Sequence, residues 1–348
     1  MTGPAIRPRA LAPGDSVAVL SPSWGGPAVF PHVFDHGIAV LRDWGLHVRE
    51  FPSTRAQPGS PAGDPRARAD DLNAAFGDPR VRAVLVSIGG DDAIRLLRWL
   101  DPDVISSNPK ILMGFSDTTV LLAAVRRMGL VTFHGPSVMA GFSQMRALPP
   151  AYEAHVRSML FDRRAHHAYV PYGGFVEAYP EWSDPANVGQ VGPFHPDSGP
   201  RVVQGTGTVR GELFGGCLEV LDWLRGTTAW PVDEEWDGRL LLLEPSEEKP
   251  SPEVWRRTLR TLGAMGVIDR IAGLLLGRAR DHSYQEKLDL ETTVRSVIAD
   301  ELDRPDLPIL ANLDFGHTDP QWVLPIGATA ELDLERRTLT LLEHWLAE

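Results

Sequence analysis

The stretch Lys110-Ile-Leu-Met-Gly-Phe-Ser-Asp-Thr-Thr-Val120 decides the fold of this chain, because a strand pattern and a helix pattern meet in it. Residues 110–113 form the short apolar run of a buried strand, and residues 118–127 have the apolar face of a helix. A serine at such a turn holds its Oγ clear of the backbone, near the N–H groups that open the helix. Ser116 is therefore a candidate nucleophile, although a serine before a helix is also a common N-cap.

Strands alternate with helices along the first half of the chain. Strand-like runs occupy residues 15–21, 46–51, 81–88 and 130–133, with helical patterns at 29–44, 64–76 and 93–100. This alternation predicts an α/β fold with a parallel sheet and crossover helices, whose sites lie beyond the carboxyl ends of the strands. Gly89-Gly90 follows one such run, as Ser116 does. The glycine pair could bring N–H groups to an oxyanion or only form a tight turn, and its spacing leaves both readings open.

The pattern changes after about residue 165. Residues 169–209 are rich in Pro and Gly but also contain several aromatic residues, which predicts an ordered loop that covers a substrate. Further strand runs follow at 239–243, 273–277 and 309–313, and residues 328–341 predict a closing hairpin. We therefore predict an N-terminal α/β domain (1–165), a connection with a covering loop (166–207) and a C-terminal domain (208–348).

Composition excludes several classes of protein. The 348 residues carry a net charge of −12, which argues against nucleic acid or an anionic membrane as partner, although a small nucleotide could still bind in a locally basic pocket. Cys217 is the single cysteine, which rules out an internal disulfide and a cysteine-based metal cluster. The first 14 residues contain no signal-like apolar run and no segment reaches the length of a membrane span, so we expect a cytoplasmic protein.

Three polar residues, Ser116, Glu244 and His317, each follow a short apolar strand. A serine hydroxyl needs a base, which histidine supplies near neutral pH, and a carboxylate can orient that histidine. The order Ser…Glu…His also occurs in α/β-hydrolases. Two alternatives stay open: Glu244 could belong to a solvated charge cluster with residues 247–249, and His134, which also follows a strand, competes for the role of base. The residues alone predict an enzyme similar to α/β-hydrolases.

Motifs spread over nearly the whole chain carry a family resemblance. They are GDSVAVLSPS at 14–23, SIGGDD at 87–92, GFSD at 114–117, HGP at 134–136, GELFGG at 211–216, LLLEPSEEKPSP at 241–252 and NLDFGH at 312–317. In this order they resemble the LD-carboxypeptidase and microcin C immunity group of serine peptidases. The resemblance implies Ser116 as nucleophile, Glu244 as the residue that orients the base, and His317 as the base. It places the oxyanion donors on the backbone of Asp117 and of Gly90 or its neighbour.

The same resemblance implies a fold and an assembly. The fold is an N-terminal flavodoxin-like domain with a parallel sheet and a smaller, β-rich C-terminal α/β domain, with the active site between them. Members of the family are homodimers that need no metal or other cofactor, and their substrates are small aminoacyl-nucleotides or short peptides.

Two substrate classes compete within that family. One branch cleaves the amide between an acidic aminoacyl group and a sulfamoyl or phosphoramidate adenylate, which detoxifies a microcin C-type toxin. Lys249 and Trp182 favour this branch, because the resemblance implies that they bind the aminoacyl group and stack on adenine, respectively. Cys217 stands where the family has an asparagine that holds the aminoacyl group, and a thiol cannot replace an amide. Packing of the loop is the alternative role for Trp182.

The other branch removes the terminal D-alanine from a murein tetrapeptide. Arg278 follows a strand and could bind a substrate carboxylate in either branch. A third hypothesis, from another class of function, is a non-catalytic protein that binds a nucleotide-like toxin. The leading prediction is an aminoacyl-adenylate hydrolase that forms an acyl-enzyme and confers self-immunity.

Overall fold

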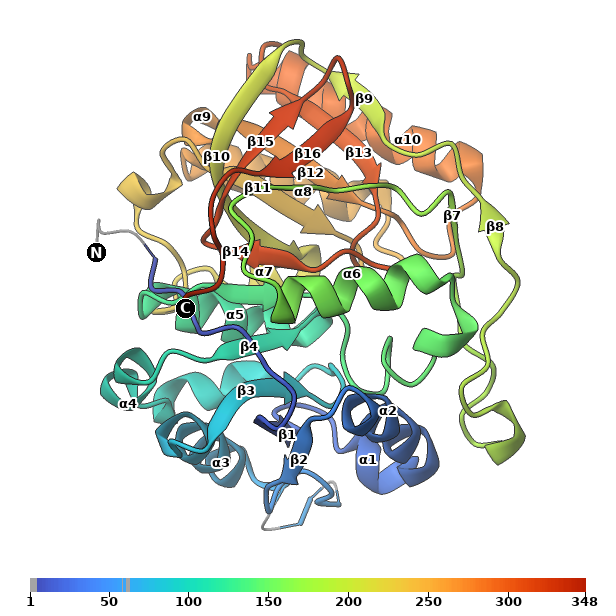
Figure 1. The fold of residues 1–348 in the computed structure, drawn as a ribbon. Coiled ribbons are helices and arrows are strands. Elements are labelled where there is room, and N and C mark those ends of the chain that lie inside the picture. Colours follow the sequence, from blue (N-terminus) through green and yellow to red (C-terminus); the bar gives the residue numbers. More distant parts are fainter. Residues whose placement is uncertain (1–4, 58, 61–62) are drawn as a thin grey trace.

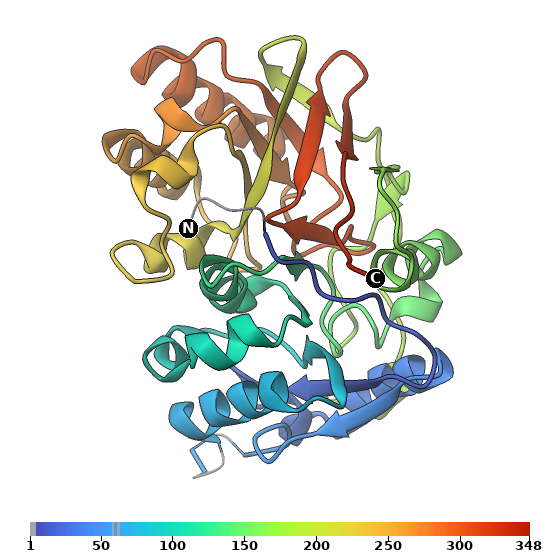
Figure 2. The ribbon, with the colours of Figure 1, turned by 60° about the vertical axis from the view of Figure 1, so that its left-hand side comes forward.

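Two β-sheets, each covered by helices, form two lobes that lie one above the other (Figure 1). The structure is a computed structural model that describes residues 5–57, 59–60 and 63–348. The dark blue N-terminal segment passes close to the C-terminus where the lobes meet, and there the backbone N–H of Ala347 donates to the carbonyl of Pro8 (Figure 2). Within the described ranges, none of the helices has the length and apolar composition that a membrane crossing needs.

The N-terminal sheet has the strand order β14-β5-β4-β3-β1-β2. The five strands from β2 to β5 are parallel, and their order is that of flavodoxin-like folds, which confirms the predicted fold class. Strands β3 and β4 are almost wholly buried, as expected for a parallel sheet covered on both faces. The strands are β1 (Ser16–Leu20), β2 (His47–Glu50), β3 (Val81–Val86), β4 (Ile111–Gly114), β5 (Thr132–His134) and β14 (Leu324–Ile326).

Helices of the N-terminal lobe begin at residues suited to helix starts. Asp64 caps α3 by accepting from the N–H of Arg66, and Asp101 caps α4 in the same way. Prolines occupy the first turn of several helices, where the missing N–H costs nothing. The helices are α1 (Gly26–Val29), α2 (Pro31–Asp43), α3 (Pro65–Gly77), α4 (Pro102–Ser107), α5 (Thr119–Arg127) and α6 (Pro150–Phe161), with 3-10 turns at Ala93–Trp99, Ser116–Thr118 and Met145–Ala147.

The C-terminal sheet has eight strands in the order β6-β16-β15-β10-β11-β12-β13-β9. Its centre, β10 to β13, is parallel, and the predicted closing hairpin is present as β15 and β16. The strands are β6 (His167–Ala168), β9 (Arg201–Gln204), β10 (Thr208–Cys217), β11 (Leu240–Glu244), β12 (Gly273–Gly277), β13 (Ile309–Leu313), β15 (Thr329–Asp333) and β16 (Thr338–Leu341). The helices are α7 (Leu218–Leu224), α8 (Pro252–Ala264), α9 (Val267–Arg270) and α10 (Tyr284–Arg295), with a 3-10 turn at Asp233–Trp236 and a π-helical turn at Ser296–Glu301.

Two segments cross between the lobes. Strand β14 belongs to the C-terminal part of the chain, but it pairs antiparallel with β5 and so completes the edge of the N-terminal sheet. The segment between β7 (Gly174–Phe175) and β8 (His195–Pro196), which contains a 3-10 turn at Pro185–Asn187, runs down past α6 toward α1 and α2 (Figure 1). There the carbonyl oxygen of Trp182 lies 2.7 Å from His32 Nε2, and Gly189 packs against His36. The predicted covering loop therefore contacts the lobe that carries Ser116.

Helix α5, which follows Ser116, docks the two lobes onto each other. Arg126 on this helix binds Glu212 of β10, with 2.7 Å between Nη2 and Oε2. At its other end, Thr119 Oγ1 accepts from the N–H of Cys217 at 3.1 Å, and a Cβ on Gly216 would lie 2.5 Å from the same oxygen. Glycine is thus needed at position 216 for the close approach of β10. As a result, the carboxyl ends of both parallel sheets meet at one junction.

We expect Gly37→Ala to destabilise the fold, because the added Cβ would lie 2.2 Å from the carbonyl oxygen of Val138. Overpacking of this kind costs about 1–3 kcal/mol. Gly77→Ala is the matched control, since its Cβ would meet only Val104 at 3.5 Å in the helical backbone of α3. Chemical denaturation should give a lower free energy of unfolding for Gly37→Ala and an equal or higher one for Gly77→Ala. Equal stability of the two variants would contradict the packing described here.

Candidate functional site

Ser116 occupies a strained turn directly after β4. Its φ is 60°, in the left-handed region that residues with a Cβ rarely adopt. Gly89, at the end of the neighbouring strand, lies against it: a Cβ there would be 2.9 Å from Ser116 Cβ and 3.0 Å from its Oγ. Gly90 has φ of 145° and its Cβ would lie 2.3 Å from Ser23 Oγ. Gly89 is therefore required by its close contact with Ser116, and Gly90 by its positive φ and its close contact with Ser23. The oxyanion role of Gly90 stays a prediction.

Asp117 follows the serine and its carboxylate points into the protein. Its Oδ2 accepts hydrogen bonds from Ser23 Oγ at 2.6 Å, from the N–H of Asp92 at 2.9 Å and from the N–H of Ala93 at 2.8 Å. Burial raises the pKa of Asp117, and these hydrogen bonds oppose the shift. The side chain thus ties the serine turn to the loops after β1 and β3. The backbone N–H of Asp117 remains among the first of the helix, which have no intrahelical acceptor.

His317 and Glu244 come together from the ends of β13 and β11. His317 Nδ1 lies 2.7 Å from Glu244 Oε2, and both side chains are buried. Gly316 has φ of 101°, and a Cβ there would lie 2.5 Å from the same carboxylate oxygen, so glycine permits the contact. Burial alone would raise the pKa of Glu244, but the charge of His317 outweighs it and holds this pKa below its usual value. This arrangement fixes the ring with Nε2 on the side away from Glu244.

His134, the competing base, lies on the other side of Glu244. Its Nε2 is 3.7 Å from Glu244 Oε1, beyond hydrogen-bonding distance, and its ring is 1% exposed. His317, in contrast, lines the same pocket as Ser116. Of the two histidines, His317 is therefore the one placed to act on the serine.

A pocket of about 400 Å³ opens between the lobes at Ser116 and His317. Aromatic side chains form much of its wall: Trp182 stacks on Tyr179 with ring planes 15° apart, and the Phe30 ring meets Trp182 edge-on. The residues that line it are Trp24, Phe30, Ile88, Gly89, Gly90, Phe115, Ser116, Ala140, Tyr179, Pro180, Glu181, Trp182, Glu247, Arg280, His317 and Gln321. Its volume is in the range of small-molecule sites.

Glu247 and Arg280 contribute charges to this pocket that sequence reasoning did not assign. Glu247 Oε2 lies 3.0 Å from His317 Nε2, and this contact, together with a smaller effect of Arg280, lowers the pKa of Glu247 to about 2. Burial lowers the pKa of His317, but the charges of Glu244 and Glu247 outweigh it and hold the pKa well above its usual value. Arg280 lies in the loop after β12, two residues beyond Arg278, where no strand or helix pattern indicates which way a side chain points.

Other predicted substrate-binding residues lie away from this lining. Cys217 is buried, and its thiol contacts Glu219 at 3.4 Å. Lys249 Nζ pairs with Glu286 at 2.8 Å, and Arg278 is buried between Asp197 and Asp314. Only Trp182 of the four lines the pocket, so substrate contacts by the other three stay predictions. Among the described residues, no group of three or more His, Cys, Asp or Glu side chains is placed to hold a metal ion.

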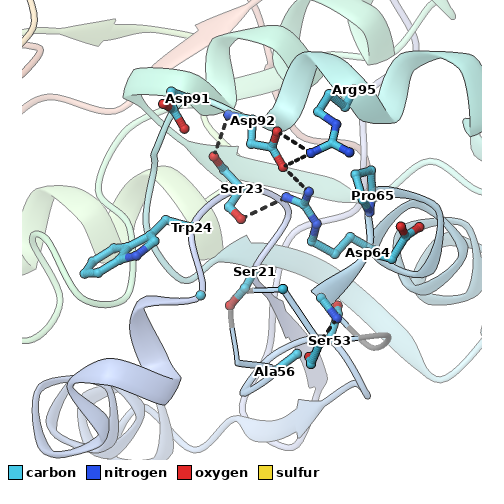
Figure 3. A pocket seen from close by; sticks show the side chains of 15 residues that line it. Ser21, Ser23, Trp24, Ser53, Ala56, Asp64, Pro65, Asp91, Asp92 and Arg95 are labelled. Carbon is cyan, nitrogen blue, oxygen red and sulfur yellow. Dashed lines mark hydrogen bonds and ion pairs between the residues drawn. The ribbon is translucent and has the colours of Figure 1, made fainter.

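A second cavity, of about 530 Å³, lies on the other side of Trp24, at the carboxyl ends of β1 and β3 (Figure 3). Its wall is polar, with Asp92 bound to Arg95 and, through its N–H, to Ser23 Oγ at 3.2 Å. Neither Ser116 nor His317 lines this cavity. Although it is the larger of the two, the predicted nucleophile and base line the pocket at Ser116 instead.

Known proteins resemble this chain over nearly its whole length. A protein of Streptomyces coelicolor provisionally named a carboxypeptidase is 34% identical over 97% of this chain and 96% of its own. The microcin C7 self-immunity protein of Escherichia coli is 27% identical over 97% and 96%. A protein of Bacillus subtilis provisionally named a murein peptide carboxypeptidase is 28% identical over 96% and 94%.

Solved structures share the fold. An MccF-like protein from Streptococcus pneumoniae, in complex with AMP, superposes with a TM-score of 0.84 at 28% identity, over 94% of this chain and 98% of its own. The self-immunity protein MccF in complex with aspartyl sulfamoyl adenosine has a TM-score of 0.85 at 24% identity, over 98% and 100%. Family models of the N-terminal and C-terminal domains of LD-carboxypeptidase match residues 17–135 and 210–332. The chain therefore belongs to the LD-carboxypeptidase family of peptidases, peptidase family S66.

Proposed function

We propose that this protein is a serine hydrolase that cleaves the amide between an aminoacyl group and a sulfamoyl or phosphoramidate adenylate. The observation that carries the proposal is the pair His317–Glu244 beside Ser116, in a pocket walled by Trp182 and other aromatic rings. Aromatic walls suit a planar base, and base–aromatic stacking contributes about 1–3 kcal/mol per base. Relatives in the family bind such ligands, as the structures with AMP and with aspartyl sulfamoyl adenosine illustrate.

The proposed reaction has two stages. His317 Nε2 takes the proton of Ser116 Oγ, which attacks the carbonyl carbon, and the N–H groups of Asp117 and Gly90 bind the resulting oxyanion. Collapse breaks the C–N bond, and the leaving nitrogen takes the proton from His317. Water then repeats the sequence on the ester, with His317 again as base, and releases the free acid and Ser116. Throughout, Glu244 stabilises the imidazolium.

An LD-carboxypeptidase is the second candidate, favoured by Arg280. This guanidinium lines the pocket and could bind the terminal carboxylate of a short peptide in two parallel hydrogen bonds. The similarity to a Bacillus subtilis protein provisionally named for murein peptides agrees with this alternative. For either candidate, we also propose domain boundaries at residues 165 and 207, a homodimer, a cytoplasmic location and no cofactor.

Wild type should release sulfamoyl adenosine from aspartyl- or glutamyl-sulfamoyl adenosine, and Ser116→Ala should not. Loss of the nucleophile lowers kcat by roughly 10⁴-fold or more. Ser107→Ala, an exposed serine at the end of α4, is the matched control and should keep full activity.

Mass spectrometry of parallel reactions with an L,D-tetrapeptide decides between the candidates. Loss of D-alanine from the peptide, without cleavage of the adenylate, would identify the protein as an LD-carboxypeptidase of murein recycling. Tight binding of the adenylate by both wild type and Ser116→Ala, with no product, would leave only the non-catalytic binding protein.

The reactivity of Ser116 should increase with pH well above the usual range of histidine. The charges of Glu244 and Glu247 hold the pKa of His317 above its ordinary value of 6.5, and only the neutral ring can accept the serine proton. Labelling of Ser116 by a neutral fluorophosphonate avoids the titration of a substrate amine. Its rate should fall as pH decreases through a midpoint above 6.5. A midpoint at or below 6.5 would mean that the two carboxylates do not act on His317 as described.

Trp182→Ala should weaken binding of the adenylate without affecting hydrolysis of a peptide lacking a base. We expect KM for aspartyl-sulfamoyl adenosine to rise by about 5- to 100-fold, the equivalent of one lost stacking contact. Trp223→Ala, which removes a tryptophan that is 41% exposed on α7, is the matched control. Equal losses on both substrates, with a lower melting temperature, would instead assign Trp182 to packing of the loop.

A further inference from the structure

Glu247 contacts Nε2 of His317, the atom that must act as the base in the proposed reaction. The imidazole is held between two carboxylates, with Nδ1 2.7 Å from Glu244 Oε2 and Nε2 3.0 Å from Glu247 Oε2. A ring held in this way carries protons on both nitrogens, because each faces an anion. It can then donate a proton but cannot accept one from Ser116. With both nitrogens facing carboxylates, the ring is not arranged to start the reaction.

The two carboxylates differ in how firmly they are held. Glu244 is fully buried at the end of β11, and Gly277 and Gly316 lie so close to it that a Cβ on either would approach within 2.6 Å or less. Glu247 lies in the loop after β11, with 55% of its side chain exposed. Ion pairs that reach solvent are weak and easily exchanged. A ligand can therefore displace Glu247 from His317 while Glu244 keeps its place.

A cation beside the scissile carbonyl is the group best placed to do this. In the proposed substrate, the α-ammonium is bonded to the carbon next to the carbonyl carbon, which must lie within reach of both Ser116 and His317 Nε2. Glu247 already contacts that nitrogen of the ring. The pocket wall also includes Glu181, and Arg280 is the arginine among its lining residues. The acidic side chains thus favour a substrate that carries a positive charge near its reacting bond.

We propose that Glu247 closes the site by pairing with His317 when no substrate is bound, and that the α-ammonium of an aminoacyl substrate takes Glu247 as its partner and releases the base. This inference rests on the proposed function and adds a requirement for an amine to it. Once Glu247 has turned to the ammonium, His317 Nε2 loses its proton to water. The neutral nitrogen then accepts the proton of Ser116 Oγ, so no other reactant is needed.

Two adenylates that differ only in the amine test the requirement. Aspartyl-sulfamoyl adenosine carries the α-ammonium, and succinyl-sulfamoyl adenosine lacks it. Wild type should prefer the first by about 10- to 100-fold in kcat/KM, as expected for one hydrogen bond to a charged group. In Glu247→Gln the preference should fall to a few-fold, and the succinyl substrate should be cleaved faster than by wild type. Glu248→Gln, an exposed neighbour outside the pocket lining, should behave like wild type.

The gain on the succinyl substrate separates this role from a purely structural one, because loss of packing cannot speed a reaction. An unchanged preference in Glu247→Gln would overturn the proposal, as would a loss of activity on both substrates in equal measure. Glu247→Ala serves as a second variant, since it removes the carboxylate without leaving an amide near His317.

A pair of fluorophosphonates tests the same role without relying on any substrate. A neutral probe should label Ser116 of Glu247→Gln about tenfold faster than that of wild type near pH 7, the range expected when a base is freed. A matching probe with an ammonium group should label wild type faster than the neutral probe does, and the variant should show no such preference. Equal rates for all four combinations would overturn the inference. If this pattern appears while neither adenylate is cleaved, the role of Glu247 stands and the proposed substrate is wrong.

Discussion

One buried carboxylate, that of Asp117, holds the N-terminal half of the site together. A single oxygen of this side chain accepts from Ser23 Oγ and from the N–H groups of Asp92 and Ala93. These donors belong to the loops after β1 and β3, whereas Asp117 itself adjoins Ser116. The strained serine turn and the Gly89-Gly90 turn are therefore fixed relative to each other by one acceptor. The strained backbone conformation of Ser116 is maintained because the surrounding contacts hold the turn in place.

Each lobe uses a buried acid in the same way. Burial works against the charged form of both Asp117 and Glu244. Hydrogen bonds oppose this effect at Asp117, and the charge of His317 opposes it at Glu244. Glu244 is compensated by His317, in a space that Gly316 keeps open. The site is thus assembled from two separately anchored halves. Helix α5 joins them, since it follows Ser116 and packs on β10 next to the strand that ends at Glu244.

The sequence was informative wherever a local pattern carries the structure. Apolar runs located the strands before Ser116, Glu244 and His317, so the three side chains could be placed at strand ends without coordinates. The contact of Glu247 with His317 could not be predicted in this way, because it depends on the conformation of the loop after β11 and on how the two lobes pack together. The same holds for Arg280, which lies in the loop after β12 and lines the pocket, whereas Arg278 is buried between Asp197 and Asp314.

Strand β14 was also beyond local prediction, because three residues carry no period, yet its position has consequences for how the protein is made. The edge of the first sheet at β5 is covered by residues 324–326, which lie near the end of the chain. During synthesis, that edge stays unpaired until residues 324–326 have left the ribosome, long after β5 itself has been made. An open edge is a template for pairing with other chains. The first lobe therefore keeps this edge open while strands β6 to β13 are being made.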